Sequence, residues 1–202
     1  MAAPSPVAII GMSCRFPGAS CPEELEQLLL NGVSSWGPIP ADRWNRDAFY
    51  HAQQGAAESL AAKHGYFLKD DISKFDARFF QVPPQEAHAM DPQQRILLQT
   101  TYEALENAGL PLEDVRGSNT SVFISAFAYD YQRMGYKDLA EVSGSHVAGT
   151  GMAMLSNRIS YVFDLTGASL TLDTGCVSFL SHDGHKTPPL MNTLLTGCHE
   201  IL

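Results

Sequence analysis

Hydrophobic positions in the N-terminal part of the chain form a short apolar run and then a helical stripe. The run Val7–Gly11 is rich in β-branched residues and closed by glycine, which predicts a strand buried on both faces of a parallel sheet. A helix is expected to begin at Pro22, ahead of two acidic residues and the apolar stripe, and to stop at Asn31 and Gly32. A strand followed by a helix is typical of α/β proteins.

Residues 33–85 show little periodicity, which is unusual for so long a stretch of a compact domain. They are rich in aromatic side chains, whereas a solvated linker would be rich in glycine, serine and charge. We therefore expect an ordered excursion that packs onto the scaffold. Its aromatic residues are Trp36, Trp44, Phe49, Tyr50, Tyr66, Phe67, Phe75, Phe79 and Phe80.

The clearest helix start in the chain lies at Asp91. Asp91 is expected to be the N-cap and Pro92 the first helical residue, while Gln94 is spaced to close a capping box. Apolar residues then recur at helical spacing up to a stop at Gly109, which Pro111 follows. These signals predict a well-capped core helix and assign it no catalytic role.

The second half of the chain predicts two further strands and a short helix. Ser121–Ser125 is a short β-rich run, a helix is expected from about Thr150, and Ser169–Asp173 alternates as a strand does. This last strand leads directly to Cys176. A thiol where a strand gives way to a helix lies among unpaired backbone N–H groups, which favour thiolate and can hold an oxyanion. From these residues alone, a small buried hydrophobe is the commoner role for such a cysteine.

Composition narrows the class of protein. With 45% hydrophobic and 17% charged residues, the 202-residue chain is globular, and its net charge of −9 argues against a nucleic-acid partner. The first residues have neither a basic n-region nor a long apolar run, so we expect a cytoplasmic protein without a membrane partner. The four cysteines form no CxxC pair, which favours free thiols.

Seven segments, taken in order, resemble the β-ketoacyl synthase domain of modular and iterative polyketide synthases, and the reducing fungal type in particular. Together they span nearly all of residues 7–176. The segments are VAIIGMSCRFPG at 7–18, IPADRW at 39–44, GYFLKDDISKFDARFF at 65–80, EAHAMDPQQRILL at 86–98, EALENAG at 103–109, NRISYVFDLTGAS at 157–169 and DTGC at 173–176.

The resemblance implies a thiolase-like α/β fold of two related halves, each a mixed sheet with helices on its faces, paired into a homodimer. The chain would hold the N-terminal half, ending soon after the nucleophile turn. In this family the cysteine matched by Cys176 accepts an acyl chain, as a thioester, from the phosphopantetheine of an acyl carrier protein. A malonyl thioester is then decarboxylated and joined to that chain by Claisen condensation. The resemblance implies no bound cofactor and no metal.

The resemblance ends a few residues after Cys176. The family continues with small residues and an amphipathic helix, whereas Val177 and Phe179 depart from that pattern and Pro188 and Pro189 would break a helix. The family's two catalytic histidines belong to the second half, in motifs resembling HGTGT and NIGH, and neither string occurs in this chain. Condensation by this chain alone is therefore not expected.

The expected organisation is a partial β-ketoacyl synthase domain over residues 1–180 and a divergent, poorly ordered tail over 181–202. So abrupt a change favours an altered reading frame, a retained intron or a premature stop. A non-catalytic pseudoenzyme or interaction module that pairs with an intact synthase is the alternative function. A metal site is a weaker one, because its spacings match no known finger. Its ligands would be Cys176, His182, His185, Cys198 and His199.

Overall fold

Two pairs of parallel strands form the centre of the protein. The computed structural model describes residues 8–52, 61–138, 142–173, 175 and 193–198. In it, β1 (Ile9–Arg15) pairs with β6 (Thr193–Cys198), and β4 (Val122–Ser125) pairs with β5 (Ser169–Leu172). The other elements are α1 (Pro22–Leu30), β2 (Trp36–Pro38), α2 (Arg46–Phe49), β3 (His64–Tyr66), α3 (Pro84–Ala89), α4 (Pro92–Asn107), α5 (Leu112–Val115), α6 (Asp130–Gly135), α7 (His146–Thr150) and α8 (Ala153–Val162).

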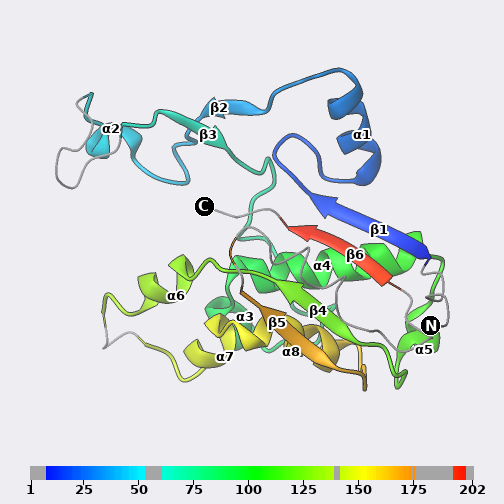
Figure 1. The fold of residues 1–202 in the computed structure, drawn as a ribbon. Helices are drawn as coiled ribbons and strands as arrows, with labels where there is room; N and C mark the ends of the chain where they lie inside the picture. The colour runs from blue at the N-terminus through cyan, green and yellow to red at the C-terminus, as the bar shows by residue number, and fades with distance from the viewer. Residues whose placement is uncertain (1–7, 53–60, 139–141, 174, 176–192, 199–202) are drawn as a thin grey trace, which may run out of the picture.

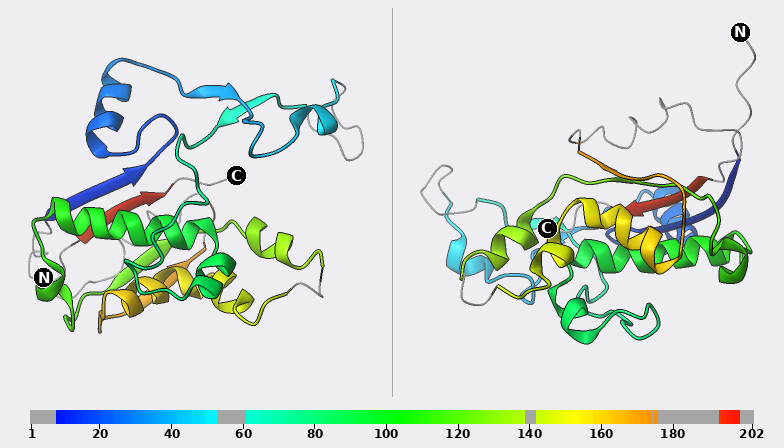
Figure 2. Two further views of the ribbon diagram at one scale, coloured as in Figure 1. Left: turned by 180° about the vertical axis from the view of Figure 1, so that it is seen from behind. Right: turned by 90° about the horizontal axis from the view of Figure 1, so that it is seen from below.

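Helices α4 and α8 cover one face of these strands (Figure 1; Figure 2, right). Helix α4 packs against β1 and β6, and α8 packs against β4 and β5. The core lies between these helices and the strands. Its fully buried side chains include Met90, Leu98, Leu105 and Phe163. Parallel strands with helices packed on them confirm the α/β class that the sequence predicts.

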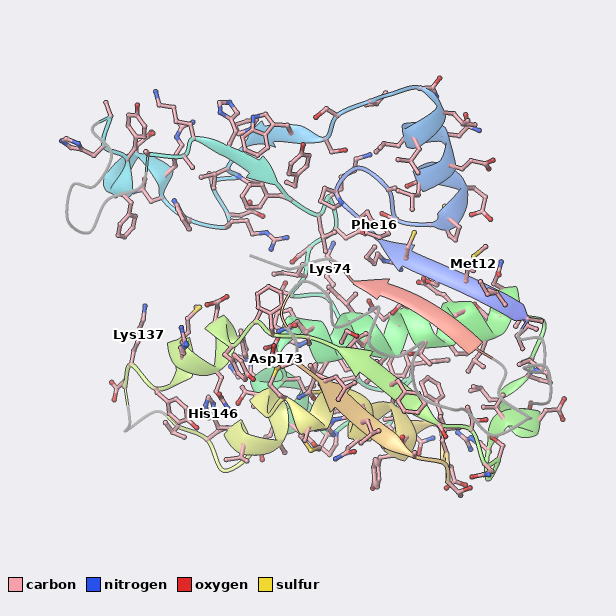
Figure 3. All side chains as sticks on the ribbon, in the orientation of Figure 1. Met12, Phe16, Lys74, Lys137, His146 and Asp173 are labelled. Carbon is pink, nitrogen blue, oxygen red and sulfur yellow. The ribbon has the colours of Figure 1, made fainter. Side chains whose placement is uncertain are left out.

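Strand β1 confirms the parallel pairing expected of the first apolar run but corrects its burial. The strand starts at Ile9 and continues to Arg15. The predicted burial on both faces is wrong, because Ile9 and Met12 are 56% and 47% exposed. On one face of the strand Met12, labelled in Figure 3, is exposed, whereas Cys14 is buried. Helix α4 covers the other face. There Gly11 lies against the Ala104 carbonyl so closely that a Cβ would overlap it.

The start of α4 confirms the predicted cap and corrects the capping box. Asp91 Oδ1 accepts from the Gln93 amide N–H at 2.8 Å, and Pro92 is the first helical residue. Gln94 does not close a box, because the N-cap N–H of Asp91 already donates to the Gly149 carbonyl at 2.8 Å. The Gln94 side chain instead donates to the carbonyls of Ala148 and Gly149, at 3.2 Å and 2.8 Å. Burial raises the pKa of the Asp91 carboxyl above its usual range.

The aromatic segment 33–85 is partly as expected. Phe80 is buried in the core and stacks on Phe75, with ring centroids 5.3 Å apart. By contrast, the antiparallel hairpin of β2 and β3 extends away from the sheet (Figure 1). Trp36 and Tyr66, which face one another on this hairpin, are each more than half exposed. The expected packing onto the scaffold is therefore confirmed near Phe80 and wrong for the hairpin.

The predicted boundaries hold for most of the other elements. Helix α1 starts at Pro22 and stops at Asn31, and β4 and β5 match the two later strands. The helix expected from about Thr150 is α8, which starts at Ala153. The sequence did not predict the short helix α7, which ends at Thr150 and is separated from α8 by the extended backbone of Gly151.

Strand β6 lies within residues 181–202, where the sequence predicts a divergent tail. It pairs with β1 in parallel register, from Ile9 opposite Thr193 to Arg15 opposite Cys198. The other residues of that tail lie outside the described part of the chain. Within the described part, no helix is long and apolar enough to cross a membrane.

Candidate active site

The candidate site is the turn that follows β5, and two sets of interactions hold this strand in place. Main-chain pairing to β4 runs along the whole strand and ends with the Ala126 N–H donating to the Leu172 carbonyl at 3.1 Å. Hydroxyl contacts to α8 support it from one face. The Thr171 hydroxyl bonds to the Ser156 hydroxyl at 2.9 Å, and the Ser169 hydroxyl donates to Asn157 Oδ1 at 2.8 Å.

Asp173 is the first residue beyond β5, and Figure 3 shows it where the ends of β4 and β5 meet. Its Oδ1 accepts from the Gly175 N–H at 3.2 Å, which folds the chain back over the carboxylate. Its Oδ2 accepts from the Tyr129 hydroxyl at 3.3 Å. Gly175 has φ +65°, a conformation that favours glycine. A Cβ there would meet nothing within 4 Å, so backbone conformation rather than space accounts for the glycine.

Tyr129 itself is held by the start of α4. It is the N-cap residue of α6, and its carbonyl accepts from the Arg133 N–H at 3.0 Å. One residue earlier, the Ala128 carbonyl accepts from Gln93 Nε2 at 3.3 Å. Gln93 also donates to both carboxylate oxygens of Asp91, so the cap of α4 and the start of α6 are joined.

Cys176, the predicted nucleophile, lies outside the described residues, as do Thr174 and the segment 177–192. The helix that would polarise its thiol, which Pro188 and Pro189 put in doubt, would also fall outside the described residues. On the described side of the site, Ser125 Oγ at the end of β4 is buried and has no hydrogen-bond partner among the described residues. Ser125 is paired with Leu172, the last residue of β5, so its buried hydroxyl lies at the end of the strand that leads to Cys176.

The other three cysteines lie in the described part of the chain. Cys14 on β1 is only 5% exposed, and burial, followed by the nearby Cys21, raises the pKa of its thiol. Cys21 is the N-cap residue of α1 and Cys198 is the last residue of β6. A raised pKa lowers the thiolate fraction, so Cys14 is expected to react slowly with electrophiles.

Four of the five ligands of the metal alternative, Cys176, His182, His185 and His199, lie outside the described residues. The fifth, Cys198, is the last residue of β6. In the ranges that are described, no three His, Cys, Asp or Glu side chains converge as metal ligands would.

Tyr129 is a residue of the site that sequence reasoning missed. Its only signal is its position four residues after β4, and nothing local indicates that its hydroxyl reaches Asp173. Arg158, from the segment NRIS, has a structural role in the described core. Its guanidinium bonds to Glu86 at 2.5 Å and to Gln94 Oε1 at 3.3 Å, and neither partner belongs to the turn after β5.

Comparison with known proteins decides the family. Residues 4–182 match the model of the beta-ketoacyl synthase N-terminal domain. The chain belongs to the β-ketoacyl synthase family. This match confirms the resemblance carried by the seven segments, and it includes the DTGC turn.

Fungal polyketide synthases are among the ketosynthase relatives. The chain is 56% identical over 177 residues to the highly reducing polyketide synthase ltbA of Aspergillus luteorubrus, covering 87% of this chain and 6% of that one. It is 50% identical over 195 residues to sdnO of Sordaria araneosa, covering 94% and 6%. The chain therefore spans a small fraction of the length of these synthases.

Solved ketosynthase structures share the fold. The oxazolomycin ketosynthase domain OzmH KS7 of Streptomyces albus JA3453 superposes with a TM-score of 0.78 and 34% identity, covering 88% of this chain and 30% of that one. The ketosynthase from module 6 of the bacillaene synthase of Bacillus subtilis 168 gives 0.73 and 31%, covering 87% and 29%. The thiolase-like ketosynthase fold is thus confirmed, with this chain covering its N-terminal part.

Proposed function

We propose that this chain is the acyl-accepting part of a ketosynthase domain that extends polyketide or fatty acyl chains. The observation that carries the proposal is the position of the DTGC motif, which directly follows β5 within a family match over residues 4–182. In open α/β sheets the carboxyl ends of parallel strands are where ligands bind. Cys176 is proposed as the nucleophile of this site.

The proposed step is a transfer between thioesters. The Cys176 thiolate attacks the carbonyl carbon of an acyl thioester carried on the phosphopantetheine of an acyl carrier protein. A new bond forms between that carbon and the cysteine sulfur, and the bond to the phosphopantetheine sulfur breaks. The departing thiolate takes up the proton that Cys176 gave up, so the step needs no cofactor and no oxidant.

The later condensation is proposed to need groups that this chain does not carry. Decarboxylation of a malonyl thioester and Claisen condensation are assigned in the family to histidines of HGTGT-like and NIGH-like motifs, and neither string occurs here. The chain also covers only 28–30% of the solved ketosynthase chains. We propose that an intact domain of this kind acts as a cytoplasmic homodimer served by an acyl carrier protein.

Comparative thiol chemistry tests the proposal. The purified chain is treated with limiting iodoacetamide near neutral pH, and labelling of each cysteine peptide is followed by mass spectrometry. We expect Cys176 to label at least about tenfold faster than Cys14, whose burial disfavours thiolate. Prior incubation with an acyl thioester should block Cys176 only.

The Cys176→Ala variant is the control for that experiment. It should take up no acyl group, while the labelling of its three remaining cysteines stays as in the unsubstituted chain. Slow labelling of all four cysteines, without acyl transfer, would overturn the proposal and favour the non-catalytic interaction module.

A further inference from the structure

We infer that Asp173, held in place by Tyr129, is a positioning residue for the nucleophile turn. The inference rests on the proposed function, because it concerns the geometry that Cys176 needs in order to accept an acyl group. It adds two residues to the reaction that act through the turn and do not touch the substrate.

Strand β5 has a fixed end. Pairing to β4 continues up to the Leu172 carbonyl, and the side chains of Ser169 and Thr171 tie the strand to α8. Asp173 follows immediately, so its main chain is held by the strand before it. Beyond Asp173 the described residues contain no further bond between β4 and β5. Asp173 is therefore the residue at which the chain leaves the paired strand.

One carboxylate contacts both Gly175 and Tyr129. Asp173 Oδ1 accepts from the Gly175 N–H, and Oδ2 accepts from the Tyr129 hydroxyl. Gly175 is the residue directly before Cys176, and its φ of +65° is a left-handed conformation that favours glycine. The carboxylate thus connects the residue before the nucleophile to the segment that follows β4.

Tyr129 is a fixed support for this carboxylate. Its segment is bonded to α4 through Gln93, which donates to the Ala128 carbonyl. It is also bonded to α6 through the Arg133 N–H. Strand β5 is held by β4 and α8, and the segment of Tyr129 is held by α4 and α6. The carboxylate of Asp173 therefore has a defined position between the two. Misplacement of a reacting group by about 1 Å can cost about 10²-fold in rate, so such a support has a kinetic consequence.

Three substitutions separate the contacts. Tyr129→Phe removes one hydroxyl, Asp173→Asn keeps an oxygen that can accept from Gly175, and Asp173→Ala removes both acceptors. Single-turnover acylation of Cys176 by butyryl-N-acetylcysteamine is followed by mass spectrometry over a range of donor concentrations. We expect the maximal rate constant to fall by about fivefold in Tyr129→Phe, the loss of one hydrogen bond, and by about 10²-fold in Asp173→Ala. Asp173→Asn should recover part of that loss.

A matched control lies on the same helix. The Tyr131 hydroxyl donates to the His88 carbonyl at 3.4 Å and does not contact Asp173, so Tyr131→Phe should acylate at the unsubstituted rate. Folding is monitored by the buried Cys14, whose labelling should stay slow in every variant. A variant that merely loses folded protein would lower the final amount of acyl-enzyme and leave the rate constant unchanged.

The outcomes distinguish the two levels of the proposal. If the unsubstituted chain is not acylated at Cys176, the proposed function fails and this inference fails with it. If the unsubstituted chain is acylated and Tyr129→Phe and Asp173→Ala match its rate constant, the inference alone is overturned. A loss confined to amplitude, or equal losses in Tyr131→Phe and Tyr129→Phe, would also overturn it.

Discussion

Replacement of Gly149 by alanine is expected to lower the free energy of unfolding by about 3 kcal/mol, because it separates α7 from the start of α4. A Cβ at Gly149 would overlap the carbonyl group of Ala89. The carbonyl of Gly149 also accepts from the Asp91 N–H and from Gln94 Nε2, each at 2.8 Å. Moving α7 outward therefore breaks two hydrogen bonds at a buried helix terminus, in addition to the steric cost.

The urea midpoint measured by pulse proteolysis tests this expectation. With a denaturant slope of about 2 kcal/mol per molar urea, Gly149→Ala should unfold about 1.5 M earlier than the unsubstituted chain. Gly144→Ala is the matched control, because nothing lies within 4 Å of a Cβ at that position. Its midpoint should be unchanged or slightly higher. Equal midpoints for both variants would contradict the close approach of α7 to α3 and α4.

Replacement of Arg158 by methionine is the second large expected effect, also about 3 kcal/mol of destabilisation. The side chain of Arg158 is 6% exposed and its guanidinium bonds to Glu86, to Gln94 and to the Ala148 carbonyl. Methionine fills similar volume but leaves the Glu86 carboxylate without its cation. Because the Glu86 side chain is 26% exposed, water screens part of the cost, which sets the effect at the lower end for a buried pair.

Two further variants check the origin of that effect. Glu86→Gln combined with Arg158→Met removes the stranded charge, so its urea midpoint should lie above that of Arg158→Met alone. Arg46→Met breaks the ion pair with Asp47, an adjacent residue on the exposed α2, and should change stability by less than about 0.5 kcal/mol. A double variant less stable than Arg158→Met would show that the stranded carboxylate is not the source of the loss.

Local signals made much of the scaffold predictable. The start of α4 at Asp91 and Pro92 and its stop at Gly109 depend on residues within one turn of the helix ends, so the sequence alone locates them. The same holds for β5, whose alternating residues end where the turn begins. The nucleophile position followed from the family motif, since the thiol chemistry by itself favoured a buried hydrophobe.

Long-range contacts explain what the sequence did not predict. Gln94 has the spacing of a capping box, but the Gly149 carbonyl, which is 55 residues away, competes for it. The exposure of Ile9 depends on which elements cover β1, and the hydrogen bond from Tyr129 to Asp173 joins segments 44 residues apart. None of these pairings leaves a periodic or local signal in the chain.

Product analysis on the purified chain tests the central claim most directly. The chain is incubated with butyryl-N-acetylcysteamine and a malonyl-loaded acyl carrier protein, and both proteins are then weighed intact by mass spectrometry. The predicted result is one butyryl group on the chain, absent from Cys176→Ala, and no β-ketoacyl group on the carrier. A β-ketoacyl carrier product formed by this chain alone, or a butyryl group that persists in Cys176→Ala, would contradict the account.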